Sequence, residues 1–319
     1  MEKVLIAGAG GFIGGHLAKK LLQEGFEVKC ADIKPLNTWF QLHKQAENHS
    51  LDLRLPENCI NVSDVDLVFN MAANMGGMGF IESHGVECMM SSTINTNLLN
   101  AASDLNVFRY FYSSSACVYN IAKQSSHDVI ALKEEDAYPA QPEGPYGWEK
   151  LFSEILCQAF SKEKGLETRI ARFHNVYGPH GSWNDGREKA PAAICRKVAE
   201  SKLQGKKEIE IWGDGEQLRT FTYIEDCIEG IMRLMFSDEK DPLNIGSSEI
   251  VSINQLTDMI SEIAGVKLDK KHILDSPLGV VGRSSDNTKI KQALEWEPTV
   301  PMTVGLQYTY KWIHDQISK

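Results

Sequence analysis

The sequence has no long apolar run and no regularly spaced cysteines. No apolar stretch approaches the roughly 18 residues that a membrane-spanning helix requires. The seven cysteines are scattered and form no C-x-x-C pair, which argues against a metal site or redox disulfide and predicts reduced thiols. The first strand-like run begins at Val4 without a preceding charged region, apolar region and cleavage site, so we expect a cytoplasmic protein.

The chain also has fewer basic than acidic residues. The chain has 33 Lys and Arg against 43 Asp and Glu, a formal net charge of −10, and no basic stripe. Such a surface repels nucleic acid and anionic membranes, so we expect neither as a partner. An anionic small molecule would depend on a few local Arg and Lys side chains and on helix N-termini.

The chain does have a regular alternation of short apolar runs with helical patterns. Over the first 110 residues, VLIAG, VKCAD, DLVFNMAA and FRYFYSSS alternate with HLAKKLLQEG and TNLLNAASDL. This alternation predicts an α/β protein with a Rossmann-type doubly wound parallel sheet. The pattern becomes mixed after about residue 176. We expect a dinucleotide-binding domain at 1–175 and a smaller, mixed α/β substrate region at 176–319, from which about 215–245 return to the first domain.

Three glycines follow the first strand-like run and directly precede an amphipathic helix. Gly8, Gly11 and Gly14 form G-x-x-G-x-x-G around Phe12 and Ile13. Glycine allows a turn with positive φ and a close approach of the backbone to a pyrophosphate, which then lies at the helix N-terminus. We assign these five residues to a dinucleotide cofactor. A tight turn without a ligand is the alternative.

The second strand-like run ends in Asp32, about 20 residues after the glycines. A carboxylate here accepts hydrogen bonds from the adenosine ribose and repels a 2′-phosphate. NAD is therefore predicted over NADP, although the nearby Lys34 weakens that preference. Asp52 is assigned to the adenine, with a solvated loop aspartate as the alternative. Ala72, at the end of DLVFNMAA, is assigned to the same cofactor site.

Tyr146 and Lys150 form a Tyr-x-x-x-Lys pair, which on a helix places both side chains on one face. A nearby ammonium and a positive nicotinamide ring would both favour phenolate and lower the tyrosine pKa from about 10. These two residues are predicted to belong to the cofactor site and to be catalytic, with Tyr146 as the base for a sugar hydroxyl. A surface pair at helical spacing is the alternative.

Several long motifs occur in one order: GAGGFIG, SSSACVY, YGWEK, RFHNVYGP, WGDGEQLRTFTYIED and RSSDNTKIKQALEWEP. Through them, nearly the whole chain resembles the extended short-chain dehydrogenase/reductase family of NAD-dependent epimerases and dehydratases that act on nucleotide sugars. The resemblance implies a nucleotide-sugar substrate, a homodimer, and tightly bound NAD that is regenerated in each turnover. It implies that Ser115 hydrogen-bonds the reacting hydroxyl, that Asn175 contacts the diphosphate region, and that Arg219 and Arg283 bind the diphosphate.

Cys117, within SSSACVY, occupies a position that lies within reach of the sugar ring in this family. Together with MAANMGGMGFIESH and GREKAPAAICRK, the motif resembles family members that invert carbons 3 and 5 of a GDP-hexose with a Cys and a Lys. The resemblance implies that Cys117 and Lys189 are the acid/base pair, without saying which is the base, and that Gly77 and Lys189 face the substrate. The alternatives are a buried inert cysteine, a solvated loop lysine and a glycine-rich turn.

Three residues depart from the family pattern. Asn74 stands where an aspartate is expected, Asn120 where many relatives have glycine, and Ser91 where an asparagine usually braces the catalytic helix. The rival functions are a nucleotide-sugar 4-epimerase, a GDP-sugar mutase and a non-catalytic NAD-binding regulator. For the dimer, the helix beginning at Tyr146 offers apolar residues at 151, 155, 156 and 159, which could instead pack on the sheet.

Overall fold

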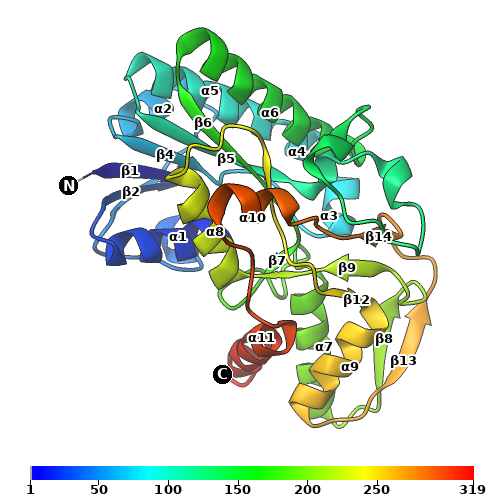
Figure 1. Cartoon of the computed structure of the whole chain (residues 1–319). Helices are drawn as coiled ribbons and strands as arrows, with labels where there is room; N and C mark the ends of the chain where they lie inside the picture. The colour runs from blue at the N-terminus through cyan, green and yellow to red at the C-terminus, as the bar shows by residue number, and fades with distance from the viewer. Residues whose placement is uncertain (1) are drawn as a thin grey trace.

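The computed structural model describes residues 2–319, and its centre is a seven-stranded, wholly parallel sheet (Figure 1). In chain order its strands are β1 (Lys3–Ala7), β2 (Glu27–Asp32), β3 (Glu47–Ser50), β4 (Leu67–Asn70), β5 (Arg109–Ser115), β6 (Glu167–Phe173) and β11 (Leu243–Ile245). In space the order is β11-β6-β5-β4-β1-β2-β3. The direction of strand addition reverses between β1 and β4, and such a switch point opens a crevice at the carboxyl ends of the strands.

Helices cover both faces of the sheet (Figure 1). One face carries α1 (Phe12–Gln23) and α8 (Ile224–Met235), and the other carries α2 (Pro56–Val62), α5 (Ser91–Asp104) and α6 (Gly144–Lys164). Side chains of β1 alternate between the two layers: Val4 and Ile6 join one buried cluster, Leu5 and Ala7 the other. Burial on both faces explains why the strands read as continuous apolar runs.

The remaining elements pack around the carboxyl ends of the strands and in a smaller lower layer (Figure 1). The helices are α3 (Met78–Ser83), α4 (Gly85–Met89), α7 (Ala190–Gln204), α9 (Ile253–Ala264), α10 (Thr288–Leu294) and α11 (Met302–Ile317). The strands are β7 (Val176–Tyr177), β8 (Glu208–Trp212), β9 (Leu218–Thr220), β10 (Thr222–Tyr223), β12 (Ile250–Ser252), β13 (Asp269–Ile273) and β14 (Gly282–Arg283). They form one three-stranded and two two-stranded sheets.

The predicted fold class is confirmed, since a doubly wound parallel sheet is observed. Within the segment predicted to return to the first domain, α8 packs beside α1 and β11 pairs with β6. The division at residue 175 stays a prediction. Strand β3, with the sequence ENHS, has no apolar pattern and was not predicted; its backbone pairs with β2 at the edge of the sheet.

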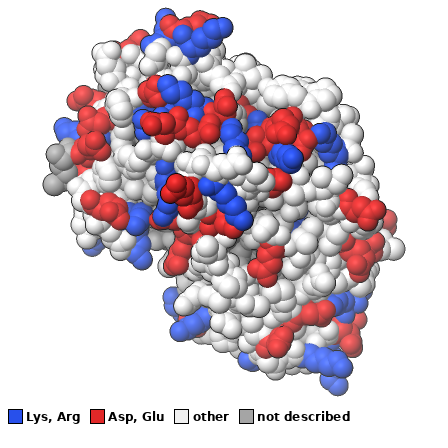
Figure 2. Space-filling model, viewed as in Figure 1, with Lys and Arg blue, Asp and Glu red and all other residues white. Residues whose placement is uncertain are grey.

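Over residues 2–319, no helix is both long and apolar enough to span a membrane. On the face shown in Figure 2, acidic and basic side chains are interspersed, without a broad field of either sign.

Candidate active site

A cavity of about 720 Å³ lies at the carboxyl ends of the central strands. It is lined by Gly8, Gly11 and Gly14, where the chain turns from β1 into α1. Gly8 has φ +84°, and a Cβ there would lie 2.7 Å from the backbone nitrogen of Ala72. A Cβ on Gly14 would overlap the Gly8 carbonyl oxygen. Only glycine permits this turn, which leaves the N-terminus of α1 open to the cavity.

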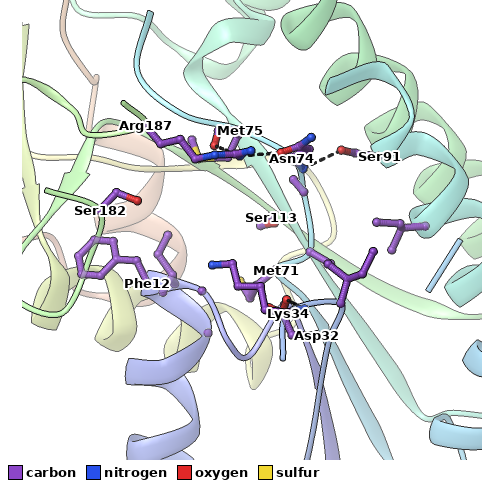
Figure 3. A pocket seen from close by; sticks show the side chains of 18 of the residues that line it. Phe12, Asp32, Lys34, Met71, Asn74, Met75, Ser91, Ser113, Ser182 and Arg187 are labelled. Atoms are coloured by element: carbon purple, nitrogen blue, oxygen red, sulfur yellow. Dashed lines mark hydrogen bonds between the residues drawn. The ribbon is translucent and has the colours of Figure 1, made fainter. Parts of the chain in front are cut away.

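Asp32 ends β2 and lines this cavity (Figure 3), and two backbone N–H groups hold its carboxylate. One oxygen accepts the Gly10 N–H at 3.0 Å and the other accepts the Lys34 N–H at 3.0 Å. The ammonium of Lys34 lies 4.7 Å from the Phe40 ring centroid. Asp52 also lines the cavity, where its carboxylate accepts hydrogen bonds from the Arg54 guanidinium at 2.6 to 3.0 Å.

All ten residues predicted to bind the cofactor line this cavity: Gly8, Gly11, Phe12, Ile13, Gly14, Asp32, Asp52, Ala72, Tyr146 and Lys150. Lys150 is buried on α6, and its ammonium donates to the Ser113 carbonyl at 3.0 Å and the Tyr112 hydroxyl at 3.2 Å. It lies 5.7 Å from the Tyr146 ring centroid. The spacing of the pair on one helix therefore does bring both side chains to one place.

The pKa of Tyr146 differs in direction from the sequence-based expectation. Burial raises it well above its usual range, and the negative charges of Cys117 and Glu149 raise it further. The Ser115 hydroxyl opposes this only in part. Among the groups of this chain, desolvation of the phenolate outweighs the nearby ammonium. The expected lowering must then come from a ligand's positive charge.

A second cavity, of about 350 Å³, adjoins the first. The two share Ser115, Tyr146 and Lys189 in their linings, together with Met75 and Phe173. The second cavity is also lined by the other predicted substrate-side residues: Gly77, Cys117, Asn175, Arg219 and Arg283. Two ligands, one in each cavity, would therefore contact each other beside the predicted catalytic side chains.

Cys117 follows β5 in a short 3₁₀ turn, with its thiol in the second cavity. Burial raises the pKa of Cys117, and the Glu143 carboxylate raises it further while Arg283 opposes both. Lys189 is the residue before α7, and burial lowers the pKa of its amine. Both shifts favour the uncharged form of the group, because burial in each case disfavours the charged one.

The two arginines predicted to bind diphosphate are engaged by the protein. Arg283 donates to the Gln124 side chain at 2.6 Å and to Glu143 at 2.7 Å. Arg219 donates to the carbonyl oxygens of Leu218 and Val281 at 2.9 and 3.2 Å. Burial and the charge of Arg283 lower the pKa of Arg219 to about 10. Both guanidiniums are thus preorganised at the cavity wall, in a strongly cationic corner.

Asn175 is fixed by both its backbone and its side chain. Its backbone has φ +40°, and its side-chain amide donates to the Thr220 carbonyl at 3.2 Å. This places the side chain between β7 and β9 at the wall of the second cavity.

Two segments interlock between the cavities, as Figure 3 shows around Asn74. The Arg187 guanidinium donates to the Asn74 side chain at 2.6 Å and to the Met75 carbonyl at 3.3 Å. Gly77 donates its N–H to the Arg187 carbonyl at 3.0 Å. A Cβ on Gly77 would lie 2.6 Å from the backbone oxygen of Glu188, which explains the glycine. Arg187 was missed in the sequence because no local pattern marks its partner.

Two further residues were missed. Glu143 lies between Cys117 and Arg283 but belongs to no motif, and only its position just before α6 could have drawn notice. The brace to α6 expected at residue 91 comes from Asn95, one turn further along α5, whose amide donates to the Ser153 carbonyl at 3.5 Å. Ser91 instead accepts the Asn74 N–H at 2.9 Å, so this departure has a local structural role.

Residues 4–246 match the NAD dependent epimerase/dehydratase family, and the chain belongs to that family. GDP-mannose 3,5-epimerase of Arabidopsis thaliana is 47% identical over 319 residues, which cover 99% of this chain and 83% of the relative. UDP-glucose 4-epimerase of Thermotoga maritima, solved with UDP-glucose, has a TM-score of 0.89 at 24% identity, covering 99% of both chains. UDP-glucuronic acid 4-epimerase of Bacillus cereus, solved with its sugar nucleotide and NAD, has a TM-score of 0.83 at 26% identity, covering 98% of this chain and 99% of that one.

NAD is the cofactor of this enzyme family, as predicted, and the first cavity fits it. The glycine turn and the α1 N-terminus suit a pyrophosphate, and the carboxylate of Asp32 suits ribose hydroxyls. The cavity volume lies within the range of about 300 to 1,000 Å³ that is usual for such ligands. When bound, NAD supplies a hydride acceptor and donor for the sugar.

Proposed function

We propose that this protein epimerises GDP-mannose at carbons 3 and 5, to GDP-L-galactose, GDP-L-gulose or both. The observation that carries the proposal is the junction of the two cavities, where Ser115, Tyr146 and Lys189 line both and Cys117 lines the second. The similarity to GDP-mannose 3,5-epimerase over 99% of the chain supports the choice of sugar nucleotide.

Tyr146 takes the proton of the carbon-4 hydroxyl while the hydride leaves that carbon, and Ser115 hydrogen-bonds the same hydroxyl. Lys150 places a buried positive charge beside the tyrosine ring and thereby supports the phenolate. Because the hydride returns at the end of the cycle, NAD is regenerated and stays bound.

Oxidation at carbon 4 makes the hydrogens on carbons 3 and 5 acidic, since both carbons adjoin the new ketone. Inversion of each carbon needs one group to remove a proton and a second group to return one on the opposite face. Cys117 and Lys189 are the proposed pair. They reach the second cavity from different segments, the turn after β5 and the start of α7.

Arg219 and Arg283, with Asn175, would bind the diphosphate, because planar guanidiniums donate in pairs to phosphate oxygens. Gly77 would present its backbone to the sugar, since it lines the second cavity. The cytoplasmic location stays a prediction from the sequence.

Incubation of the purified protein with GDP-mannose in heavy water, without added cofactor, tests the proposed function. We expect deuterium at carbons 3 and 5 and new galactose- or gulose-configured products, detected by NMR and mass spectrometry. Heat-inactivated protein is the control. A product epimerised only at carbon 4 of a sugar nucleotide, without deuterium at carbons 3 and 5, would show a 4-epimerase instead.

A homodimer is part of the proposal, supported by an exposed apolar face that α4 and α6 share. The face consists of Val86, Met89, Trp148, Phe152 and Ile155, each about half exposed or more. Leu151, one of the apolar residues noted in the sequence, is buried in a separate core cluster and is not part of this face.

We expect Phe152→Asp to convert the dimer to a monomer, because a desolvated carboxylate on this face opposes association. Light scattering coupled to size exclusion measures the mass. Phe236→Asp, at a comparably exposed position at the end of α8, is the control and should leave the mass unchanged. A wild-type protein that elutes as a monomer would contradict the proposal.

A further inference from the structure

The carboxylate of Glu143 lies between two residues of the second cavity. Its Oε2 accepts a hydrogen bond from the Cys117 thiol at 3.4 Å and one from Nη2 of Arg283 at 2.7 Å. Nη1 of Arg283 is also 3.6 Å from the Cys117 sulfur. The three side chains therefore form a closed triangle of contacts, all within the lining of the cavity.

The backbone holds the thiol and the carboxylate together. The N–H of Glu143 donates to the Cys117 carbonyl at 2.9 Å. Gly147, in the first turn of α6, packs so closely on that same carbonyl that a Cβ would overlap it. Because Glu143 directly precedes the helix that carries Tyr146, the contact between the two side chains is tied to the catalytic helix.

Several charged or titratable groups face Cys117 from the elements around it: Glu143, Arg283, Arg219, Lys189, Tyr146 and the Ser115 hydroxyl. Glu143 is the carboxylate that touches the sulfur. Glu188 and Glu210 also line the cavity, but they pair with Arg196 at 3.0 Å and Lys271 at 3.4 Å. Burial raises the pKa of Glu143, yet Arg283 brings the net result below its usual value, so Glu143 is an ionised acceptor.

Building on the proposed function, we propose that Glu143 is a positioning residue that orients the Cys117 thiol through its hydrogen bond and keeps it protonated until it reacts with the sugar. When Cys117 acts as the acid, its S–H bond breaks as a C–H bond forms on the sugar carbon, and the sulfur keeps the electron pair; removal of the next carbon-bound proton by the thiolate restores the thiol. The charge of Arg283 stabilises the thiolate while it exists. Because two carbons are inverted in turn, Cys117 must pass through both forms within one visit of the sugar; Glu143 favours the thiol and Arg283 favours the thiolate.

Alkylation of Cys117 in the purified holoenzyme measures this coupling without substrate. Cys117 is 8% exposed, and the other six cysteines are at most 1% exposed, so iodoacetamide should label it selectively. The rate against pH, followed by mass spectrometry, reports the thiolate fraction. Since the Glu143 charge raises the pKa of Cys117, Glu143→Gln should move the midpoint down by about one to two pH units. Glu135→Gln, at an exposed carboxylate, should leave it unchanged.

Turnover of GDP-mannose completes the test. Glu143→Gln should lower kcat by about 10²-fold with little change in KM, and Glu143→Asp should recover part of the loss. An unchanged alkylation midpoint would overturn the coupling, and a shifted midpoint with wild-type kcat would overturn the positioning role. If wild-type protein does not turn over GDP-mannose while the midpoint still shifts, the proposed function fails but the Cys117–Glu143 pair stands.

Discussion

Replacement of Tyr146 by phenylalanine is expected to lower kcat for epimerisation by about 10²- to 10⁴-fold, the usual contribution of a positioned acid/base group. The variant keeps the ring that packs at the junction of the two cavities and removes only the hydroxyl. Lys150 keeps its hydrogen bonds to Ser113 and Tyr112, so the catalytic helix should stay in place. Turnover assays and the cofactor content of the purified variant measure the two effects separately.

Tyr138→Phe is the matched control, because its hydroxyl belongs to an exposed side chain outside both cavities. It should retain wild-type kcat. Bound NAD together with full activity in Tyr146→Phe would reject this tyrosine as the base. If wild-type protein also binds NAD but turns over none of the GDP-, UDP- and dTDP-sugars, a non-catalytic NAD-binding regulator becomes the better description.

Removal of either member of the proposed acid/base pair should abolish carbon epimerisation while carbon 4 can still be oxidised. In heavy water, Cys117→Ala and Lys189→Met should each lower deuterium incorporation at carbons 3 and 5 by about 10²-fold or more. Hydride transfer needs neither side chain, so borodeuteride should trap the carbon-4 ketone and label that carbon in both variants. The positions of the label, read by NMR, separate the two steps.

The control variants carry the same types of substitution at residues outside both cavities. For Cys30→Ala the residue lies in β2 within the core, and for Lys206→Met it is exposed beyond the end of α7. Neither residue lines the first or the second cavity. Both should incorporate deuterium as the wild type does. Full activity in Cys117→Ala would instead favour a 4-epimerase, whose chemistry needs no proton transfer at carbon.

Local sequence patterns were enough to predict the sheet and the cofactor side of the site. A strand followed by Gly8, Gly11 and Gly14 and then by a helix specifies its own geometry, since the turn, the strand and the helix are contiguous. Likewise Tyr146 and Lys150 are one helical turn apart, and that spacing is the same in any fold. Strand β3 was not predicted because its backbone hydrogen bonds, rather than an apolar pattern, define it.

The substrate side depended on contacts between segments far apart in the chain. The family resemblance was enough to single out Cys117, Lys189 and Arg283. Only packing places Glu143 between the thiol and the guanidinium, because Glu143 is 26 residues from Cys117 and 140 from Arg283 in the sequence. The direction in which the Tyr146 pKa is shifted also depends on packing, because burial raises it and the Tyr-x-x-x-Lys spacing does not report burial. The sequence by itself determined which groups are available, because their spacing is local; the tertiary structure decided their neighbours and solvation, because both arise only when distant segments pack together.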